Sequence, residues 1–340
     1  MRVTIRQIAE KTHVSTSTVS RVLNNYAYVD EATRSAVLQV AQELGYPIAN
    51  PRRVPRVSRS ILMLVRSDGF QREQEILASG GIESAVSSGM QPVFDKHGIA
   101  ARVQRTRMDP AEALAYANDL SVAGLVFIGG IVNHDLILEL QKTTLPFVVV
   151  GAHVRPLQVN CVVADYLSGM QQVVAHLAST GRRRIGLVNG PTTTTSSAEK
   201  YKGFRLALAL HHLEFDPARV IESEFDAESG YSQTLELLKR TPDVDALAYA
   251  IDQTAIGGLR ALKECGRRVP DDVAVTGFYG YNYARFTEPP LTSVQVDFQT
   301  MGGIAAHRLC MLLQEPDPQA WELTTPTTLI VRASSLPGSA

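Results

Sequence analysis

The sequence has few cysteines and no long apolar segment. Its 340 residues include three cysteines, Cys161, Cys265 and Cys310, which lie far apart. A small and odd number of cysteines argues against a disulfide framework and favours a reducing compartment. No apolar run approaches the roughly 18 residues that a membrane span needs. The opening MRVTIRQIAEKT lacks the apolar core of a secretory signal. We therefore expect a cytoplasmic protein with no membrane partner.

Signatures of catalysis and of cofactor binding are also scarce. Ser197 and Lys200 match an S-x-x-K pattern, but the companion motifs of the enzymes that use it are absent. The first apolar run leads into RSDGFQRE instead of a dinucleotide-binding glycine loop. The eight histidines are scattered, and the adjacent His211 and His212 would point about 100° apart on a helix. We expect no catalytic residue, no metal site and no cofactor, so the chain is not predicted to be an enzyme.

Charge is distributed unevenly along the chain. Residues 1–60 contain nine Lys and Arg against four Asp and Glu, whereas the remaining residues contain 24 against 30. A small basic segment before a larger acidic body favours contact of the first segment alone with a polyanion. The alternative is a chance fluctuation of surface charge.

Residues 4–45 have the pattern of three short helices. Asp30 is placed to cap the third helix and Gly45 to end it. Apolar residues recur at helical spacing in three groups: Ile5, Ile8 and Ala9; Val19, Val22 and Leu23; Val37, Val40, Ala41 and Leu44.

The second of these helices has two different faces. At 100° per residue, Val19 and Val22 share one face, and Ser17 and Arg21 lie opposite, one turn apart. Short hydroxyl side chains allow a helix to approach the floor of a major groove, where arginine can bond a guanine edge. A serine-rich surface helix with no such use is the alternative.

From residue 61 to residue 335, apolar runs alternate with amphipathic stretches. Such alternation predicts an α/β fold with doubly wound parallel sheets, and the length suits two lobes. Ligands of such sheets bind at the carboxyl ends of the strands, so we expect a ligand between the lobes. The predicted strands are 61–65, 124–130, 146–151, 161–165, 184–190, 246–252 and 273–278.

Several segments, in order and spacing, resemble the lactose-repressor (LacI/GalR) family. They include TIRQIAEKTHVSTSTVSRVLNN at 4–25, VDALAYAIDQTAIGGLRAL from 244, VPDDVAVTGF from 269 and PPLTSVQVDFQTMG from 289. The resemblance implies a helix-turn-helix head over 1–46, a hinge linker over 47–60, and a body over 61–335 that resembles periplasmic binding proteins. It places lobe 1 at about 61–162 and 295–322, and lobe 2 at about 163–294 and 323–335.

The same resemblance implies a function in transcription. The protein is expected to be a nucleoid-associated repressor, a homodimer that binds a near-palindromic operator in double-stranded DNA, with a small-molecule effector that alters operator affinity. Base-reading positions fall on Thr16, Ser17 and Arg21. Positions that contact the DNA backbone fall on Thr4, Ser15, Thr18, Ser20, Asn24 and Thr33.

The linker departs from the family pattern. Its members usually form a short hinge helix there, with a leucine in the minor groove, but here Pro55 holds that position. An interior proline costs a helix about 3 kcal/mol. Two alternatives are open: Arg52 and Arg53 lie along the DNA as an extended basic arm, or the linker is a solvated tether.

The resemblance also implies an effector site in which several usual polar positions are changed. The stacking aromatic corresponds to Phe225 and the usual arginine to Lys200, whereas Tyr279 replaces an acidic residue and Asp252 fits the pattern. We predict a flat, less hydroxylated or anionic ligand between Phe225 and Tyr279, with Lys200 on its acidic group. In one alternative, Asp68 or the threonines at 192–195 rebuild a sugar site; in another, no effector binds.

Overall fold

The computed structural model describes residues 4–23, 31–44, 46, 60–66, 75–130 and 132–336. It divides the chain into two compact units, Met1–Arg59 and Ser60–Ala340, here called the head and the body. In the described residues, no helix is both long and apolar enough to cross a membrane. Residues named above that lie outside the described residues are Asn24, Asp30, Gly45, Arg52, Arg53, Pro55 and Asp68.

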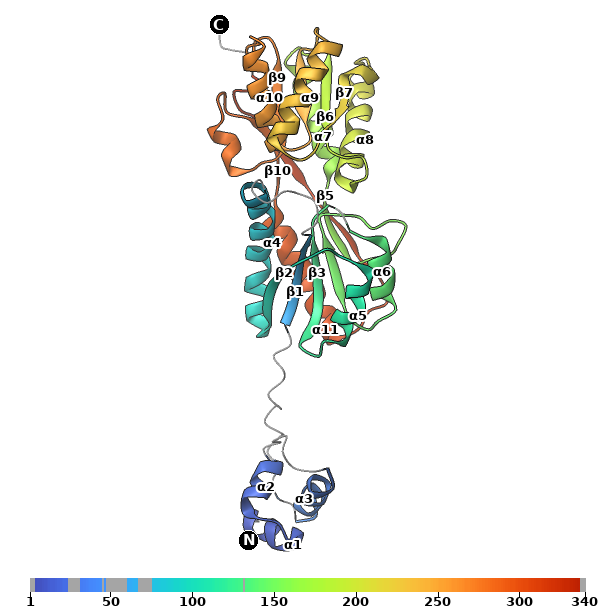
Figure 1. Cartoon of the computed structure of the whole chain (residues 1–340), viewed down its shortest axis with the longest axis vertical. Coiled ribbons are helices and arrows are strands. Elements are labelled where there is room, and N and C mark those ends of the chain that lie inside the picture. The colour runs from blue at the N-terminus through green and yellow to red at the C-terminus, as the bar shows by residue number, and fades with distance from the viewer. Residues whose placement is uncertain are drawn as a thin grey trace. The chain divides into compact units, whose positions relative to one another are not determined.

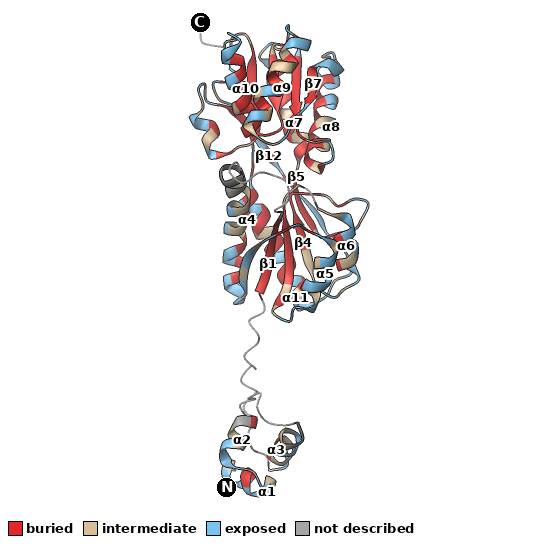
Figure 2. Cartoon of the chain, viewed as in Figure 1, coloured by how far each residue is buried: buried red, intermediate tan, exposed pale blue. Residues whose placement is uncertain are grey.

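The head contains the three predicted helices, α1 (Ile5–Thr12), α2 (Thr16–Leu23) and α3 (Glu31–Glu43). One apolar face of each helix meets the others in a small core (Figures 1 and 2). Apolar spacing of three and four residues explains this packing, since it places side chains on one side of each helix. The buried members of the core are Ile8, Ala9, Val19, Val22, Val37 and Ala41.

Lobe 1 of the body is a six-stranded parallel sheet with helices on both faces. The strand order is β11 (Glu322–Thr325), β5 (Cys161–Ala164), β4 (Phe147–Val150), β3 (Val122–Ile128), β1 (Ser60–Arg66) and β2 (Ala100–Thr106). Helices α4 (Glu75–His97) and α11 (Phe298–Gln314) pack together on one face, and α5 (Pro110–Asn118) and α6 (His134–Gln141) on the other (Figure 1). Side chains of β1 alternate between these two cores from Ile61 to Val65, which explains why these five consecutive residues are all apolar.

Lobe 2 repeats this architecture. Its strand order is β12 (Thr327–Ile330), β10 (Thr292–Val296), β9 (Ala274–Tyr279), β8 (Ala246–Tyr249), β6 (Ile185–Asn189) and β7 (Val220–Glu222). Only the β10–β12 pair is antiparallel in this sheet. Helices α7 (Tyr166–Ser179) and α8 (Thr195–Leu210) pack on one face, and α9 (Ala227–Arg240) and α10 (Asp252–Glu264) on the other.

The chain passes between the lobes three times. The first two passages end at Asp165 and Asp297, whose carboxylates accept hydrogen bonds from backbone N–H groups and cap α7 and α11. The third joins β11 to β12. Strands β5, β10 and β11 extend two or three residues beyond the boundaries expected at 162, 294 and 322.

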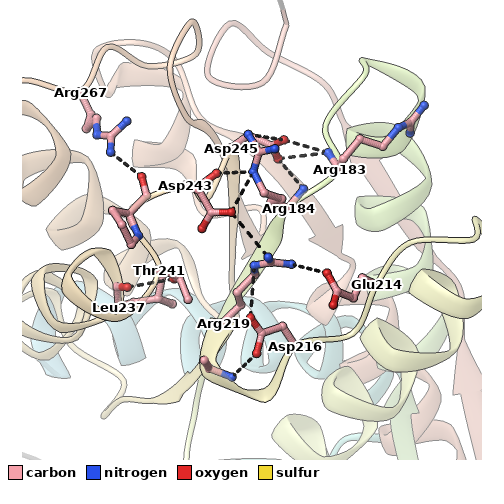
Figure 3. A network of polar contacts seen from close by, with 12 residues as sticks. Arg183, Arg184, Glu214, Asp216, Arg219, Leu237, Thr241, Asp243, Asp245 and Arg267 are labelled. Atoms are coloured by element: carbon pink, nitrogen blue, oxygen red, sulfur yellow. Dashed lines mark hydrogen bonds and ion pairs between the residues drawn. The ribbon is translucent and has the colours of Figure 1, made fainter.

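The amino ends of the lobe 2 strands carry a network of charged side chains (Figure 3). Asp245 accepts hydrogen bonds from the backbone N–H groups of Arg183 and Arg184 at 2.9–3.1 Å. The Arg219 guanidinium lies 3.7 Å from carboxylate oxygens of Asp216 and Asp243. Charges at this end of the sheet are thus matched by opposite charges near the surface.

Candidate DNA-binding and effector sites

Helix α2 exposes its hydroxyl-bearing face. Val19 and Val22 are buried, as the helical pattern predicts, whereas Ser17 on the opposite side is exposed. Thr16 is also exposed at the start of the helix. Arg21 belongs to α2, but its side chain lies outside the described part of the structure. The backbone places Arg21 one turn after Ser17, so both residues start from the same side of the helix.

A group of hydroxyls marks the amino end of α2. Ser15 Oγ accepts a hydrogen bond from the Thr18 backbone N–H at 3.1 Å, in the manner of an N-cap. The same oxygen lies 2.7 Å from Ser17 Oγ and 2.8 Å from Thr18 Oγ1. Hydroxyls and a helix amino terminus together form the kind of surface that holds phosphate oxygens.

A tight turn joins α1 to α2. His13 ends α1 in the left-handed conformation, with a φ of 54°, and its N–H donates to Ala9 O. The second helix therefore starts after only three residues, as in a helix-turn-helix unit. The remaining predicted backbone contacts are dispersed: Thr4 is exposed before α1, Ser20 is half-buried on α2, and Thr33 is half-buried on α3.

In the body, Lys200 does not face solvent. Its side chain is fully buried, and Nζ donates a 2.7 Å hydrogen bond to Ala250 O. Nζ also lies 4.1 Å from the ring centre of Tyr279 and 4.3 Å from that of Phe278. Burial lowers the pKa of Lys200 well below its ordinary value. In this conformation Lys200 supports the aromatic rings and offers no accessible ammonium to an acidic group, contrary to our expectation.

Tyr279 ends β9 in an unusual backbone conformation. Its φ of 93° is rare for a bulky residue. Strain of this kind, about 1–3 kcal/mol, persists only where the surroundings enforce it. Here the ring packs against Tyr166 and Phe298, with centres 6.2 and 5.7 Å apart. Since Phe298 belongs to lobe 1 and Tyr166 to lobe 2, Tyr279 joins the facing sides of the two lobes.

Asp252 is equally enclosed. Its Oδ1 accepts from Ser293 Oγ at 2.5 Å and its Oδ2 from the Tyr281 backbone N–H at 2.8 Å. Burial raises the pKa of Asp252 to about 7, although these hydrogen bonds act in the opposite direction. The carboxyl therefore ties the loop after β9 to β10 and α10, and both of its oxygens are already engaged.

The other predicted effector positions differ in exposure. Phe225 is half-buried and packs closely over Gly190, where an added Cβ would lie 2.1 Å from its ring. Ile251 and Val296, at the carboxyl end of β8 and the end of β10, are both buried apolar neighbours. Lys200, Tyr279 and Asp252 thus gather around the carboxyl ends of β8 and β9, with apolar neighbours.

The lobes touch at these strand ends through hydrogen bonds. Tyr166 OH donates to Gly151 O at 3.2 Å, and Thr195 Oγ1 donates to His153 O at 3.1 Å. Sequence reasoning did not single out Tyr166, and it considered Thr195 only among the threonines at 192–195 of an alternative sugar site. Their side chains acquire a role only once the lobes are folded against each other.

The S-x-x-K pattern does not form a nucleophile with a base. Ser197 Oγ is buried and lies 2.7 Å from Thr194 Oγ1, within the cap of α8. Lys200 Nζ is directed to Ala250 O instead. The geometry therefore gives this pattern a structural explanation.

A helix-turn-helix head before a two-lobed, doubly wound body defines a class of transcriptional regulators. Comparison with known families agrees with this class: residues 4–47 match "Bacterial regulatory proteins, lacI family", and residues 174–335 match "Periplasmic binding protein-like domain". The chain is 32% identical to the transcriptional regulator CelR of Thermobifida fusca, over 98% of each chain. It belongs to the lacI family of DNA-binding transcriptional regulators and is not an enzyme.

Other relatives and solved structures agree. The ribose operon repressor of Haemophilus influenzae is 26% identical over 97% of this chain and 98% of its own. A complex of CelR with cellobiose has a TM-score of 0.73 at 31% identity, covering 98% of this chain and all of the other. A lac repressor dimer bound to operator and the anti-inducer ONPF has a TM-score of 0.71 at 26% identity, covering 99% and 100%.

Proposed function

We propose that this regulator binds a near-palindromic operator as a homodimer and reads its bases with Thr16, Ser17 and Arg21. The main support is the exposed hydroxyl face of α2, directly opposite the buried Val19 and Val22. A dimer presents two such helices to two half-sites related by symmetry. Repression follows where the operator overlaps a promoter. Thr4, Ser15, Thr18, Ser20, Asn24 and Thr33 are the proposed contacts to the DNA backbone.

Substitution of Arg21 tests the base-reading role. Arg21→Ala should reduce discrimination between operator and mutated duplex by about 1–3 kcal/mol, because a bidentate contact to one base is lost. Binding is measured by fluorescence anisotropy at fixed salt. Lys11→Ala, an exposed cation at the end of α1, is the matched control and should leave discrimination unchanged. Equal discrimination by wild type and Arg21→Ala would reject the assignment.

For the linker, we propose the basic arm, in which Arg52 and Arg53 contact DNA phosphates. Each phosphate contact steepens the salt dependence of binding by about 0.9 logarithmic unit. The double variant Arg52→Ala/Arg53→Ala should therefore have a shallower slope than wild type. An unchanged slope would favour the solvated tether.

We propose further that a small-molecule effector binds between the lobes, against Phe225 and Tyr279. Phe225 and Tyr279 are half-buried residues, whereas Lys200 and Asp252 are fully buried. A ligand at this end of the sheet therefore meets aromatic carbon before it meets a charge. We infer a flat effector with fewer hydroxyls than a simple sugar, because unpaired buried hydroxyls cost about 1–3 kcal/mol each. Because Lys200 is fully buried, the proposed effector does not need an anionic group.

A saccharide is the second candidate, and the similarity to the CelR–cellobiose complex favours it. Calorimetry of the full chain against neutral planar heterocycles, cellobiose, glucose and ribose separates the two. We expect a heterocycle to bind. Its affinity should be at least about tenfold weaker in Phe225→Ala, because this substitution removes the stacking contact, worth about 0.5–1.5 kcal/mol beyond its buried area. Tight binding of cellobiose or a monosaccharide would reject the less hydroxylated ligand in favour of the second candidate.

Effector binding and operator binding would be coupled through thermodynamic linkage. A ligand that prefers one arrangement of the lobes shifts the population toward it, and the effect on DNA affinity is matched by an equal effect of DNA on ligand affinity. Tyr166 and Thr195 are the polar contacts that would report such a shift, since both bond lobe 1 backbone carbonyls.

A further inference from the structure

Three potential metal ligands meet at one side of the lobe 1 sheet. Cys161 begins β5, and Glu322 begins the adjacent strand β11, directly opposite Cys161 in the parallel register. His153 lies in the loop after β4. A ring nitrogen of His153, Cys161 Sγ and a Glu322 carboxylate oxygen all lie within 4.8 Å of one another. Glu322 is far from the other two residues in sequence, which explains why the spacing of histidine and cysteine predicted no metal site.

We propose that His153, Cys161 and Glu322 bind one zinc ion, with water as the fourth ligand. One thiolate, one imidazole and one carboxylate form a donor set that suits zinc. Zinc bonds of about 2.0–2.3 Å place tetrahedral ligand atoms roughly 3.3–3.6 Å apart. His153 Nδ1 and Glu322 Oε1 are already 3.2 Å apart. Cys161 Sγ lies within 4.8 Å of both other ligand atoms and would have to approach them to complete the triangle.

His153 provides a second, independent indication. Its Nδ1 is buried and makes no well-directed hydrogen bond, despite its closeness to Glu322. Buried polar atoms are normally bonded, so an orphaned imidazole nitrogen calls for a partner. A metal ion between Nδ1 and the carboxylate would provide one. The described part of the chain contains no other group of three such ligands this close together.

Arg155 occupies part of the place a cation would take. Its guanidinium forms a close ion pair with Glu322. Two-thirds of the Arg155 side chain is exposed, so it can leave without disturbing the core. A metal ion must displace this internal cation, and removal of Arg155 should therefore tighten metal binding. This gain distinguishes a metal site from a purely structural ion pair.

Metal binding would release the thiol proton of Cys161 to solvent as the zinc–sulfur bond forms. It would also fix the loop that contains His153, whose carbonyl oxygen accepts a hydrogen bond from Thr195 of lobe 2. Zinc would thereby stabilise one of the contacts between the lobes.

Cobalt(II) is the spectroscopic probe for the experiment, since thiolate coordination gives a charge-transfer band in the near ultraviolet. The full chain is used with Cys265→Ser, because Cys265 is an exposed thiol. The single tryptophan, Trp321, precedes Glu322, and its carbonyl oxygen accepts from the Cys161 N–H at 2.8 Å. Quenching of Trp321 fluorescence therefore gives a second readout. Zinc affinity is then measured by competition.

We expect one cobalt ion per chain, quenching of Trp321, and displacement by zinc. Removing a residue that only supports a metal ligand typically weakens metal binding 10- to 100-fold. Cys161→Ser or His153→Ala removes a ligand itself and should therefore weaken metal binding by at least about 100-fold. Arg155→Gln, an exposed substitution compatible with folding, should tighten it. Its control, Lys142→Gln, removes an exposed cation paired with Glu139 elsewhere in lobe 1 and should have no effect.

Unchanged affinity in Arg155→Gln, or a charge-transfer band that persists in Cys161→Ser, would overturn the zinc site. So would the absence of stoichiometric binding. The measurement uses neither DNA nor an effector, and its outcome is therefore independent of the function proposed above.

Discussion

The head and the body use polar side chains in opposite ways. On α2 of the head, Thr16 and Ser17 are exposed on a helix that is held by a small apolar core. In lobe 2 of the body, Lys200 and Asp252 are fully buried. An exposed hydroxyl costs almost nothing to keep, whereas a buried charge costs free energy unless it is well paired.

This difference indicates how each region would be tuned. Side chains on the head surface can change without loss of stability, so base specificity can vary while the fold is retained. Buried polar groups of the body are coupled to their neighbours, and a change in one alters stability, packing and ligand contact together. The experiments below test this contrast by comparing stability effects in the two regions.

The largest effect is expected at Lys200. Lys200→Ala should lower the free energy of unfolding of the body by about 3 kcal/mol, because it leaves a cavity beneath Tyr279 and Phe278. Urea unfolding followed by Trp321 fluorescence reports the body alone, since this is the only tryptophan. Lys200→Met keeps most of the volume and removes the charge, so its change should be within about 1 kcal/mol of zero.

Arg184→Ala at the charged amino end of the same sheet is the matched comparison. Its guanidinium is about half exposed, and such a pair contributes at most about 1 kcal/mol. If Lys200→Met were as destabilising as Lys200→Ala, the ammonium itself and not its volume would hold the rings.

An intermediate effect is expected from the protonation of Asp252. Its folded-state pKa of about 7 exceeds the ordinary value, so the folded chain keeps a proton that the unfolded chain releases above about pH 4. The contribution of Asp252 to the free energy of unfolding is therefore fully present at low pH and is lost as the pH rises through about 7. Between about pH 5 and pH 8, the loss should be roughly 2–3 kcal/mol.

Asp252→Asn should flatten this pH dependence, measured by urea unfolding at several pH values. The control is Asp272→Asn, because hydrogen bonds from Arg268 lower the pKa of Asp272 to about 2 and keep it ionised throughout. An equal slope in wild type and Asp252→Asn would show that other groups cause the dependence.

The smallest stability effect is expected on the head. Ser17→Ala should change the free energy of unfolding of the head by less than about 0.5 kcal/mol, because Ser17 is exposed. Circular dichroism of the helices during unfolding measures this. Operator affinity should nevertheless fall, and Ser35→Ala, an exposed hydroxyl on α3, should change neither quantity. A strongly destabilised Ser17→Ala would contradict the contrast between the two regions.

The spacing of apolar residues predicted those helices and strands that depend on the local sequence. The three head helices and seven central strands follow from apolar spacing, and all are present. Strand β2 escaped prediction because it lies at a sheet edge, where Arg102 and Arg105 remain exposed and interrupt the apolar run. The three-residue β7 is too short to produce a pattern.

Long-range packing explains what the sequence did not reveal about the site. Lys200 lies next to Tyr279, and its burial depends on α8, β8 and β9 coming together. Likewise, His153, Cys161 and Glu322 meet only through the pairing of β5 with β11. The family resemblance suggested candidate effector positions, whereas the exposure of these residues could be read only from the three-dimensional structure.

The central claim is that α2 of the head reads duplex DNA. Selection of bound duplexes from a random pool by the full chain, at physiological salt, tests it most directly. We predict enrichment of duplexes with two inverted half-sites, each containing a preferred guanine. The preference for this guanine should disappear in Arg21→Ala. Recovery of unenriched sequences, or the same enriched site with Arg21→Ala, would contradict it.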